Sequence, residues 1–320
     1  MKTESQIPTT NLTDNSCGCL NESPSVRTYV YEAISKNSKE SLPDSYILPN
    51  DRLPDVENQG SINACVAFAT AEILNILNKV ETGEDVKFSE GFIYGYNRNE
   101  TARYEGMYPQ STLDHMRNTG SVPKIYYDAL YEMPEMRDKL LADKNFEKLK
   151  EISEKYRIKS YVGFLKGEKE EIKRALYEYK YPILGVSNFH FGESHAIIVI
   201  GWNKDGFIIQ NSWGESWGDK GRGTVPLSAV SYAFLLIDEV IEPNFVDVKQ
   251  SDWFYKAVKE AYYNGFMKGV GESRFDPNGY LSRAQAAQMI VNMSKKYDDV
   301  IQIMSNRISE LEKIVSKLSR

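Results

Sequence analysis

Residues 58–69 read Asn-Gln-Gly-Ser-Ile-Asn-Ala-Cys-Val-Ala-Phe-Ala, and this stretch decides how the rest of the chain is interpreted. From Ala64 to about Val80, apolar residues recur at helical spacing and form one apolar face. The spacing predicts a helix that begins at Cys65. At a helix N-terminus, the helix dipole and the unpaired backbone N–H groups favour a thiolate, which is the nucleophilic form of cysteine.

The composition is that of a folded protein without a membrane span. The chain has 320 residues, which corresponds to one large domain or two smaller ones. Hydrophobic residues make up 41% and aromatic residues 12%, enough for a core and too many for a disordered chain. The formal charge of −6 and the lack of a basic stripe argue against a nucleic-acid partner. No apolar run approaches the roughly 20 residues that span a bilayer, so we expect a soluble protein.

Three cysteines are too few for a disulfide scaffold. Cys17 and Cys19 lie in residues 1–41, a polar segment that reads as a flexible N-terminal arm. Cys65 alone would more often be a small buried hydrophobe than a nucleophile, so its reactivity needs support from other residues. The sequence has neither a His-Glu-x-x-His motif nor a second cysteine pair at metal-binding spacing. We therefore expect no metal site and no cofactor.

The second half of the chain changes from helical to strand-like patterns. Glu168–Lys180 is predicted to be an amphipathic helix. After it, short apolar runs separated by Gly, Asn and Asp predict four strands: Pro182–Val186, Ala196–Ile200, Gly206–Gln210 and Phe234–Ile237. A helical first half and a strand-rich second half indicate an α+β fold, with a cleft where the two halves meet.

Cysteine catalysis needs a base, a group that orients the base, and donors for the oxyanion that forms on the attacked carbonyl. His195 precedes an apolar strand that would hold its ring rigidly, and it is the candidate base. Asn211 ends a later strand, and its side-chain oxygen is the candidate acceptor for the imidazole. Gln59, six residues before Cys65, is the candidate oxyanion donor together with the Cys65 backbone N–H.

At these positions the chain resembles the papain-like cysteine peptidases. Residues 58–69 are similar to that family's oxyanion-Gln and nucleophile motif, and residues 194–196 to its His motif. Residues 211–218, Asn-Ser-Trp-Gly-Glu-Ser-Trp-Gly, are similar to its Asn motif. His195 follows Cys65 by 130 residues and Asn211 follows it by 146, which matches the family spacing of roughly 130–150 residues.

The resemblance covers residues 42–242 and implies a two-lobed fold, in which a helical lobe and a β-sheet lobe enclose an active-site cleft. It implies a cysteine endopeptidase with a Cys-His-Asn triad and a Gln oxyanion hole, acting on protein or peptide substrates. It also implies that Trp213 shields the bond between the His and Asn side chains, with Trp217 packed nearby. Ile62 and Val66 depart from the family's usual Cys and Trp, which fits a bacterial branch that depends less on disulfides.

The arm, residues 1–41, has two interpretations. It is either unstructured, or it is a short propeptide that lies in the cleft or caps Cys65 with one of its thiols. The arm also bears on location, because Met1–Ser25 shows no secretory signal peptide.

Residues 243–297 form a separate pattern of two helices. A predicted helix at Trp253–Asn264 is followed by a Gly-bounded turn and by a second helix, which begins with a capping box of Ser282 and Gln285. This pattern resembles one repeat of the S-layer homology domain, by which many bacterial surface proteins bind cell-wall polysaccharide. The resemblance implies that Arg283 binds an anionic sugar substituent.

It further implies that Asp247 and Trp253 help to line that site. The family usually combines three repeats, whereas this chain has one, and Gln285 replaces the usual acidic residue. The alternative is that Trp253, Phe245 and Phe275 are the core of a small helical docking domain.

The C-terminal tail, residues 298–320, predicts a coiled-coil helix. Its apolar residues alternate at spacings of three and four: Ile301, Met304, Ile308, Leu311, Val315 and Leu318. We expect a parallel homo-oligomer, a trimer or a dimer, held by residues 244–320. The alternative is a helix that docks on its own catalytic domain.

Two other functions stay open at this point. The same Cys–His machinery would serve an amidase or peptidoglycan hydrolase, and a surface-anchored binding protein would result if the peptidase fold were inactive. The wall-binding module indicates the cell surface. The lack of a visible signal peptide leaves the cytoplasm, a non-Sec export route and delivery by a particle as alternatives.

Overall fold

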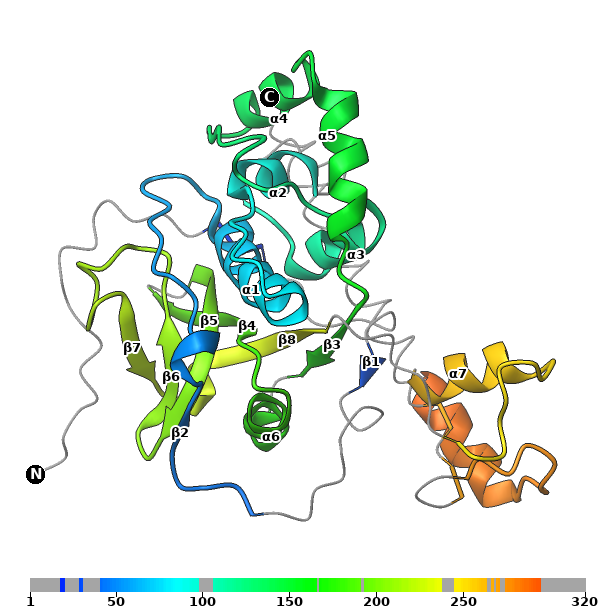
Figure 1. The fold of residues 1–320 in the computed structure, drawn as a ribbon. Coiled ribbons are helices and arrows are strands. Elements are labelled where there is room, and N and C mark those ends of the chain that lie inside the picture. Colours follow the sequence, from blue (N-terminus) through cyan, green and yellow to red (C-terminus); the bar gives the residue numbers. More distant parts are fainter. Residues whose placement is uncertain are drawn as a thin grey trace, which may run out of the picture. The chain divides into compact units, whose positions relative to one another are not determined.

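The computed structural model describes residues 18–20, 29–30, 41–97, 106–165, 167–190, 193–237, 245–263, 266–267, 269–270 and 274–294. The chain forms two compact units (Figure 1). The first consists of residues 1–23 and 35–240, and the second of residues 24–34 and 241–320.

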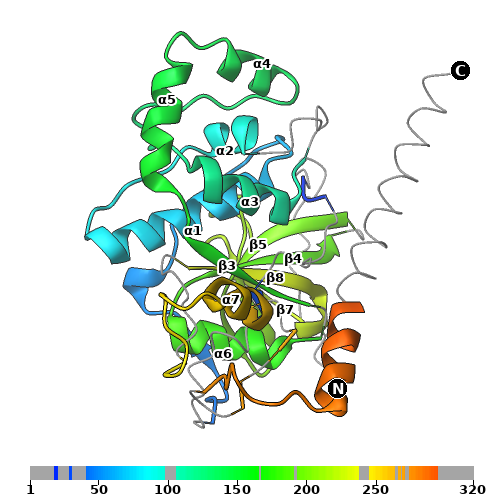
Figure 2. The ribbon, with the colours of Figure 1, turned by 90° about the vertical axis from the view of Figure 1, so that its right-hand side faces the viewer.

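The first unit places helices on both faces of one sheet. In Figures 1 and 2, α1 lies above the sheet together with α2 to α5, and α6 lies below it. The α-helices are α1 (Cys65–Thr82), α2 (Glu90–Tyr96), α3 (Pro109–Thr119), α4 (Glu135–Leu141), α5 (Phe146–Ser153) and α6 (Lys169–Tyr179). Three short 3₁₀ helices accompany them: η2 (Asn50–Arg52), η3 (Glu154–Tyr156) and η4 (Leu227–Ala229).

Helix α1 is the central helix of this unit. Every residue from Cys65 to Asn78 is buried, because small and apolar side chains let the helix pack between the sheet and the other helices. It ends at Gly83, whose φ of 78° is the left-handed conformation that glycine adopts without strain. The predicted helices at 64–80 and 168–180 are confirmed as α1 and α6.

The sheet is antiparallel, and its strands follow the order β3-β8-β4-β5-β6-β7, with β2 paired to β5. All four predicted strands are confirmed, and three of them are longer than predicted. The strands are β2 (Tyr46–Ile47), β3 (Ser160–Phe164), β4 (Ile183–His190), β5 (Glu193–Asn203), β6 (Gly206–Gln210), β7 (Arg222–Val225) and β8 (Val230–Ile237).

Two consequences of the register matter for the site. His195 lies in β5 opposite Ser187 of β4, at the last regular pair before a register shift between these strands. Gln210 is the last residue of β6 and pairs with Ile198 on one side and with Arg222 on the other. Asn211 therefore leaves the sheet at a point that both neighbouring strands fix.

The second unit contains β1 (Tyr29–Val30), α7 (Tyr255–Tyr263) and a helix over residues 283–294. The predicted capping box is present: Ser282 N–H donates to Gln285 Oε1 (2.8 Å), and Gln285 N–H donates to Ser282 Oγ (3.2 Å). Among the described residues of this unit, the buried core consists of Phe245, Val248, Val258 and Phe275.

The alternative that Phe245, Phe275 and Trp253 form this core is confirmed for Phe245 and Phe275 and wrong for Trp253, which is 92% exposed. Residues 298–320, which are predicted to form a coiled coil, lie outside the described residues. Within the described part of the chain, no helix combines the length and the apolar character that crossing a membrane requires.

Candidate active site

The thiol of Cys65 lies against the strand that carries His195. Cys65 is the first residue of α1, and it is fully buried. The backbone N–H of Ala196 donates to Cys65 Sγ at 3.4 Å, which places the residue next to His195 beside the sulphur. The helix and the sheet thus bring together two residues that are 130 positions apart in the sequence.

His195 and Asn211 form a buried pair. The distance between His195 Nε2 and Asn211 Oδ1 is 2.7 Å, so Nε2 carries the proton that the amide oxygen accepts. Asn211 Oδ1 also accepts from the Ser212 backbone N–H (2.8 Å), which fixes the amide. The Trp213 ring covers the imidazole at a centroid distance of 4.7 Å, and Trp217 packs edge-on against Trp213 at 5.9 Å.

Gln59 joins the loop before α1 to the loop after Asn211. Its Oε1 accepts from Ser212 Oγ (2.5 Å), and its backbone N–H donates to the Ser212 carbonyl (2.9 Å). Its amide Nε2 donates to the Ile62 carbonyl at 2.8 Å. The structure therefore brings all four sequence-predicted residues to one place, with Gln59 held to the segment that follows Asn211.

Burial controls the charge of the thiol in this arrangement. It raises the pKa of Cys65 to about 11, although backbone N–H groups of Ala196, Gly18 and Val66 oppose the shift. The sequence alone indicates a thiolate, because Cys65 is at a helix N-terminus. In this arrangement the loss of water outweighs the favourable backbone groups, so burial favours the neutral thiol.

Part of the N-terminal arm supplies this burial. The segment Gly18–Leu20 runs beside Met107, and Cys19 pairs with Met107 in a parallel bridge. Met107 N–H donates to the Gly18 carbonyl (2.7 Å), and Leu20 N–H donates to the Met107 carbonyl (2.8 Å). Gly18 is buried and Cys19 is 7% exposed. Since the Gly18 backbone N–H also donates to the Cys65 thiol, the segment covers Cys65.

Two glycines permit this close approach. A Cβ atom on Gly18 would lie 1.9 Å from the Asn63 carbonyl oxygen, and a Cβ on Gly106 would lie 2.7 Å from the Gly18 oxygen. Both distances are shorter than a van der Waals contact allows. Sequence reasoning missed Gly18, Gly106 and Met107, because no motif links them to Cys65 across more than 40 residues.

In the second unit, the three residues singled out for polysaccharide binding have different surroundings. Asp247 accepts from the backbone N–H groups of Phe275 (2.9 Å) and Asp276 (2.8 Å), and it faces Arg274 at 3.6 Å. These backbone donors hold the pKa of Asp247 below its usual range. Asp247 therefore orders the loop at residues 274–276, whereas Trp253 and Arg283 are exposed to solvent.

Comparisons with known proteins agree with this division. Residues 43–226 match the family model of the papain family cysteine proteases, and residues 244–287 match that of the S-layer homology domain. The structure resembles that of xylellain, a cysteine protease from Xylella fastidiosa, with a TM-score of 0.58 and 18% identity. That match covers 75% of this chain and 99% of xylellain, and it concerns the fold.

Two relatives match different parts of the chain. Chymomexicain from Jacaratia mexicana is 25% identical over 175 residues, which is 52% of this chain and 80% of chymomexicain. The surface-layer 125 kDa protein of Lysinibacillus sphaericus is 32% identical over 83 residues, which is 23% of this chain and 7% of that protein. The matches to six further cysteine-protease relatives cover 38% to 62% of the length of those proteins.

Proposed function

Because the chain belongs to the papain family of cysteine proteases, we propose that it is an endopeptidase in which Cys65, His195 and Asn211 form the catalytic triad. One arrangement carries the proposal. The buried bond between His195 and Asn211 (2.7 Å) lies next to the contact between the Ala196 N–H and Cys65 Sγ (3.4 Å). A nucleophile at the start of α1 and a base in β5 are thereby brought together with an orienting group that directly follows β6.

The chemistry follows from this geometry. Cys65 Sγ attacks the scissile carbonyl carbon, and its proton passes to His195 Nδ1, because Nε2 already donates to Asn211. The resulting imidazolium gives that proton to the leaving amine as the C–N bond breaks, which leaves a thioester on Cys65. Water then attacks the thioester with His195 as the base, and the acid product leaves.

Gln59 and the Cys65 backbone N–H are assigned to the oxyanion. The Gln59 amide nitrogen, which donates to the Ile62 carbonyl in this structure, is the side-chain group that we assign to the substrate oxygen. The bond from Ser212 to Gln59 Oε1 keeps the amide plane in place during the reaction. A donor that is fixed before the charge develops is worth more than one that must be reoriented.

In the same site, the arm segment Gly18–Leu20 occupies the space next to Cys65 that a substrate must enter. It covers Cys65, fills the space against Asn63 and uses both backbone hydrogen-bonding groups of Met107. A peptide bond cannot approach the sulphur until this segment leaves. The arm therefore acts as a built-in inhibitor of the site, and of the two interpretations of the arm this is the one that the contacts support.

The proposed tether is the second unit. Its S-layer homology match supports binding of cell-wall polysaccharide, with Trp253 offering an exposed aromatic face and Arg283 a cation for an anionic sugar substituent. Asp247 contributes by ordering the loop at residues 274–276. Sedimentation with purified cell walls tests the tether. Trp253→Ala and Arg283→Ala should each release the protein into the supernatant, whereas the exposed control Lys256→Ala should not.

Labelling with an epoxide thiol inhibitor tests the enzyme. Stoichiometric modification at Cys65, together with loss of labelling in His195→Ala, supports the protease. An inert Cys65 in folded protein from which the arm has been removed would instead indicate a binding protein. Release of muropeptides from cell walls without release of peptides from casein would favour the amidase.

A further inference from the structure

A buried carboxyl group lies on the helix that carries the nucleophile. Glu72 follows Cys65 by seven residues, or two helical turns, so both side chains project from the same face of α1. Glu72 is 1% exposed. The mechanism above gives it no role, and a carboxyl group in the interior is costly unless other groups compensate for the water that it loses.

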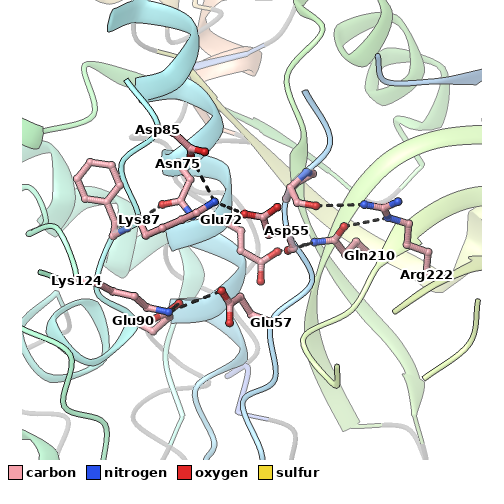
Figure 3. Close-up of polar contacts among 12 residues, drawn as sticks. Asp55, Glu57, Glu72, Asn75, Asp85, Lys87, Glu90, Lys124, Gln210 and Arg222 are labelled. Carbon is pink, nitrogen blue, oxygen red and sulfur yellow. Dashed lines mark hydrogen bonds and ion pairs between the residues drawn. The ribbon is translucent and has the colours of Figure 1, made fainter. Parts of the chain in front are cut away.

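The partner of Glu72 is the residue before Asn211. Gln210 Nε2 donates to Glu72 Oε2 at 2.7 Å and to the Asp55 carbonyl at 2.5 Å. On its other side, Gln210 Oε1 accepts from Arg222 Nε at 3.1 Å, and Arg222 also donates to the Pro54 carbonyl at 3.2 Å. Figure 3 shows Gln210 between Glu72 and Arg222. Because Arg222 engages the oxygen, the amide nitrogen must face Glu72.

These contacts give the nucleophile helix a second tie to the sheet. The first tie is the bond from Ala196 to Cys65 Sγ, next to His195. The second is the bond from Gln210 to Glu72, next to Asn211. The two ties involve Ala196 and Gln210, the sequence neighbours of His195 and Asn211, so a shift of α1 against β6 would disturb the distance on which the proposed triad depends.

The charges around Glu72 favour a neutral carboxyl group. Its remaining oxygen, Oε1, has no hydrogen-bond partner among the described residues. Burial raises the pKa of Glu72 well above its usual value, and the neighbouring carboxylates of Glu57, Glu90 and Asp55 raise it further, while the bond from Gln210 opposes them. Two nearby lysines are engaged by other acids: Lys124 by Glu90 (2.8 Å) and Glu57 (3.8 Å), and Lys87 by Asp55 and Asp85.

We propose that Glu72 is a positioning residue that acts through Gln210 to hold Asn211, and with it the His195 ring, in register with Cys65. The inference rests on the proposed function, because it concerns the geometry of the same triad. A neutral carboxyl group is well suited to this task, because it accepts the hydrogen bond from the Gln210 amide without placing a charge beside three carboxylates.

Two substitutions separate the hydrogen bond from the volume of the side chain. Glu72→Gln keeps a neutral oxygen that accepts from Gln210, so kcat should stay within about twofold of the wild-type value. Glu72→Leu removes the acceptor, and kcat per titrated active site should fall about tenfold with KM nearly unchanged, because small misplacements of catalytic groups are costly. The pH profile of Cys65 alkylation should also change in Glu72→Leu alone. Glu81→Leu, an exposed position on the same helix, is the control.

The outcomes are distinguishable. A wild-type protein that neither cleaves peptides nor labels at Cys65 contradicts the proposed function. An active wild type with the same kcat and pH profile in Glu72→Leu contradicts this inference, even if the melting temperature falls. If Glu72→Leu does not fold, Gln210→Met removes the same bond from the strand side. It should lower kcat about tenfold, and an unchanged kcat there overturns the inference.

Discussion

At the scale of single residues, the site combines groups that hold one another in place. Ser212 connects two of them, because its N–H donates to Asn211 Oδ1 and its Oγ to Gln59 Oε1. The Asn211 amide, which we propose orients His195, and the Gln59 amide, which we assign to the oxyanion, thus share one neighbour. The geometry of the base and that of the oxyanion site are therefore coupled.

Gln59 gives the first prediction. Gln59→Ala should lower kcat by roughly 10²–10³, the usual cost of one oxyanion donor, with a much smaller effect on KM. Ser212→Ala should cost less, because it frees the Gln59 amide without removing it. Steady-state kinetics on a fluorogenic peptide decides the matter. An unchanged kcat in Gln59→Ala would show that the oxyanion donor has been assigned to the wrong residue.

Glu72 gives a prediction about stability and pH. In the unfolded chain this carboxyl ionises near pH 4.3, while in the folded chain its pKa is raised well above that value. As pH rises above 4.3, the unfolded state loses a proton that the folded state keeps, so stability falls by up to about 1.4 kcal/mol per pH unit until the folded pKa is reached. Glu72→Gln lacks this loss.

Urea unfolding at pH 5, 6 and 7 measures the difference. The stability of Glu72→Gln relative to the wild type should grow as pH rises across this range. Glu81→Gln, which alters an exposed carboxylate on the same helix, should show no such trend. Parallel curves for the wild type and Glu72→Gln would mean that Glu72 is already ionised in the folded protein.

At the scale of elements, the arm segment Gly18–Leu20 lies against Cys65, and we propose that it shields the thiol from substrate and water. Gly18→Val places a side chain where the Asn63 carbonyl leaves no room, so it should expel the segment from Cys65. Water then reaches the thiol and its pKa falls. Alkylation of Cys65 by iodoacetamide at pH 7 should accelerate about tenfold, which corresponds to an activation free energy lower by about 1.4 kcal/mol.

A chain that begins at residue 41 is the matched control, since it lacks the segment altogether. The alkylation rate of this shortened chain should equal that of full-length Gly18→Val, because in both proteins the segment no longer covers Cys65. Equal rates in the intact wild type and in the shortened chain would mean that the segment does not protect Cys65 in solution.

The elements also show which parts of the molecule sequence reasoning reaches. Helix α1 and the four apolar strands are predicted because their patterns are local and strong. Strand β7 reads Arg-Gly-Thr-Val and is mostly half-buried, so its pattern is weak, and β3 follows a charge-rich helical region. The contacts of Gly18 and Glu72 depend on residues far away in the sequence, and neither residue type signals its partner.

At the scale of the whole molecule, the chain joins a protease unit to a unit with an S-layer homology match. In the second unit, Ile290 and Val291 are 59% and 45% exposed on the helix at residues 283–294. Exposed apolar residues on a helix are suited to association with another surface. Residues 298–320, which carry the heptad pattern, follow this helix in the sequence.

The heptad pattern of the C-terminal tail, residues 298–320, therefore predicts that copies of this chain associate. Light scattering at micromolar concentration should show a homo-oligomer, either a trimer or a dimer, and deletion of residues 298–320 should convert it to a monomer. A monomeric full chain would contradict this prediction. An oligomer that survives the deletion would place the association elsewhere.

The central claim is that Cys65 is the nucleophile of a peptidase. Its most direct test is release of acid-soluble peptides from casein by the protein and by Cys65→Ala, each in a form that begins at residue 41 so that the arm is absent. The account predicts steady release by the shortened wild type and none by the shortened Cys65→Ala. Release that survives the loss of Cys65, or no release from a folded shortened wild type, would contradict it.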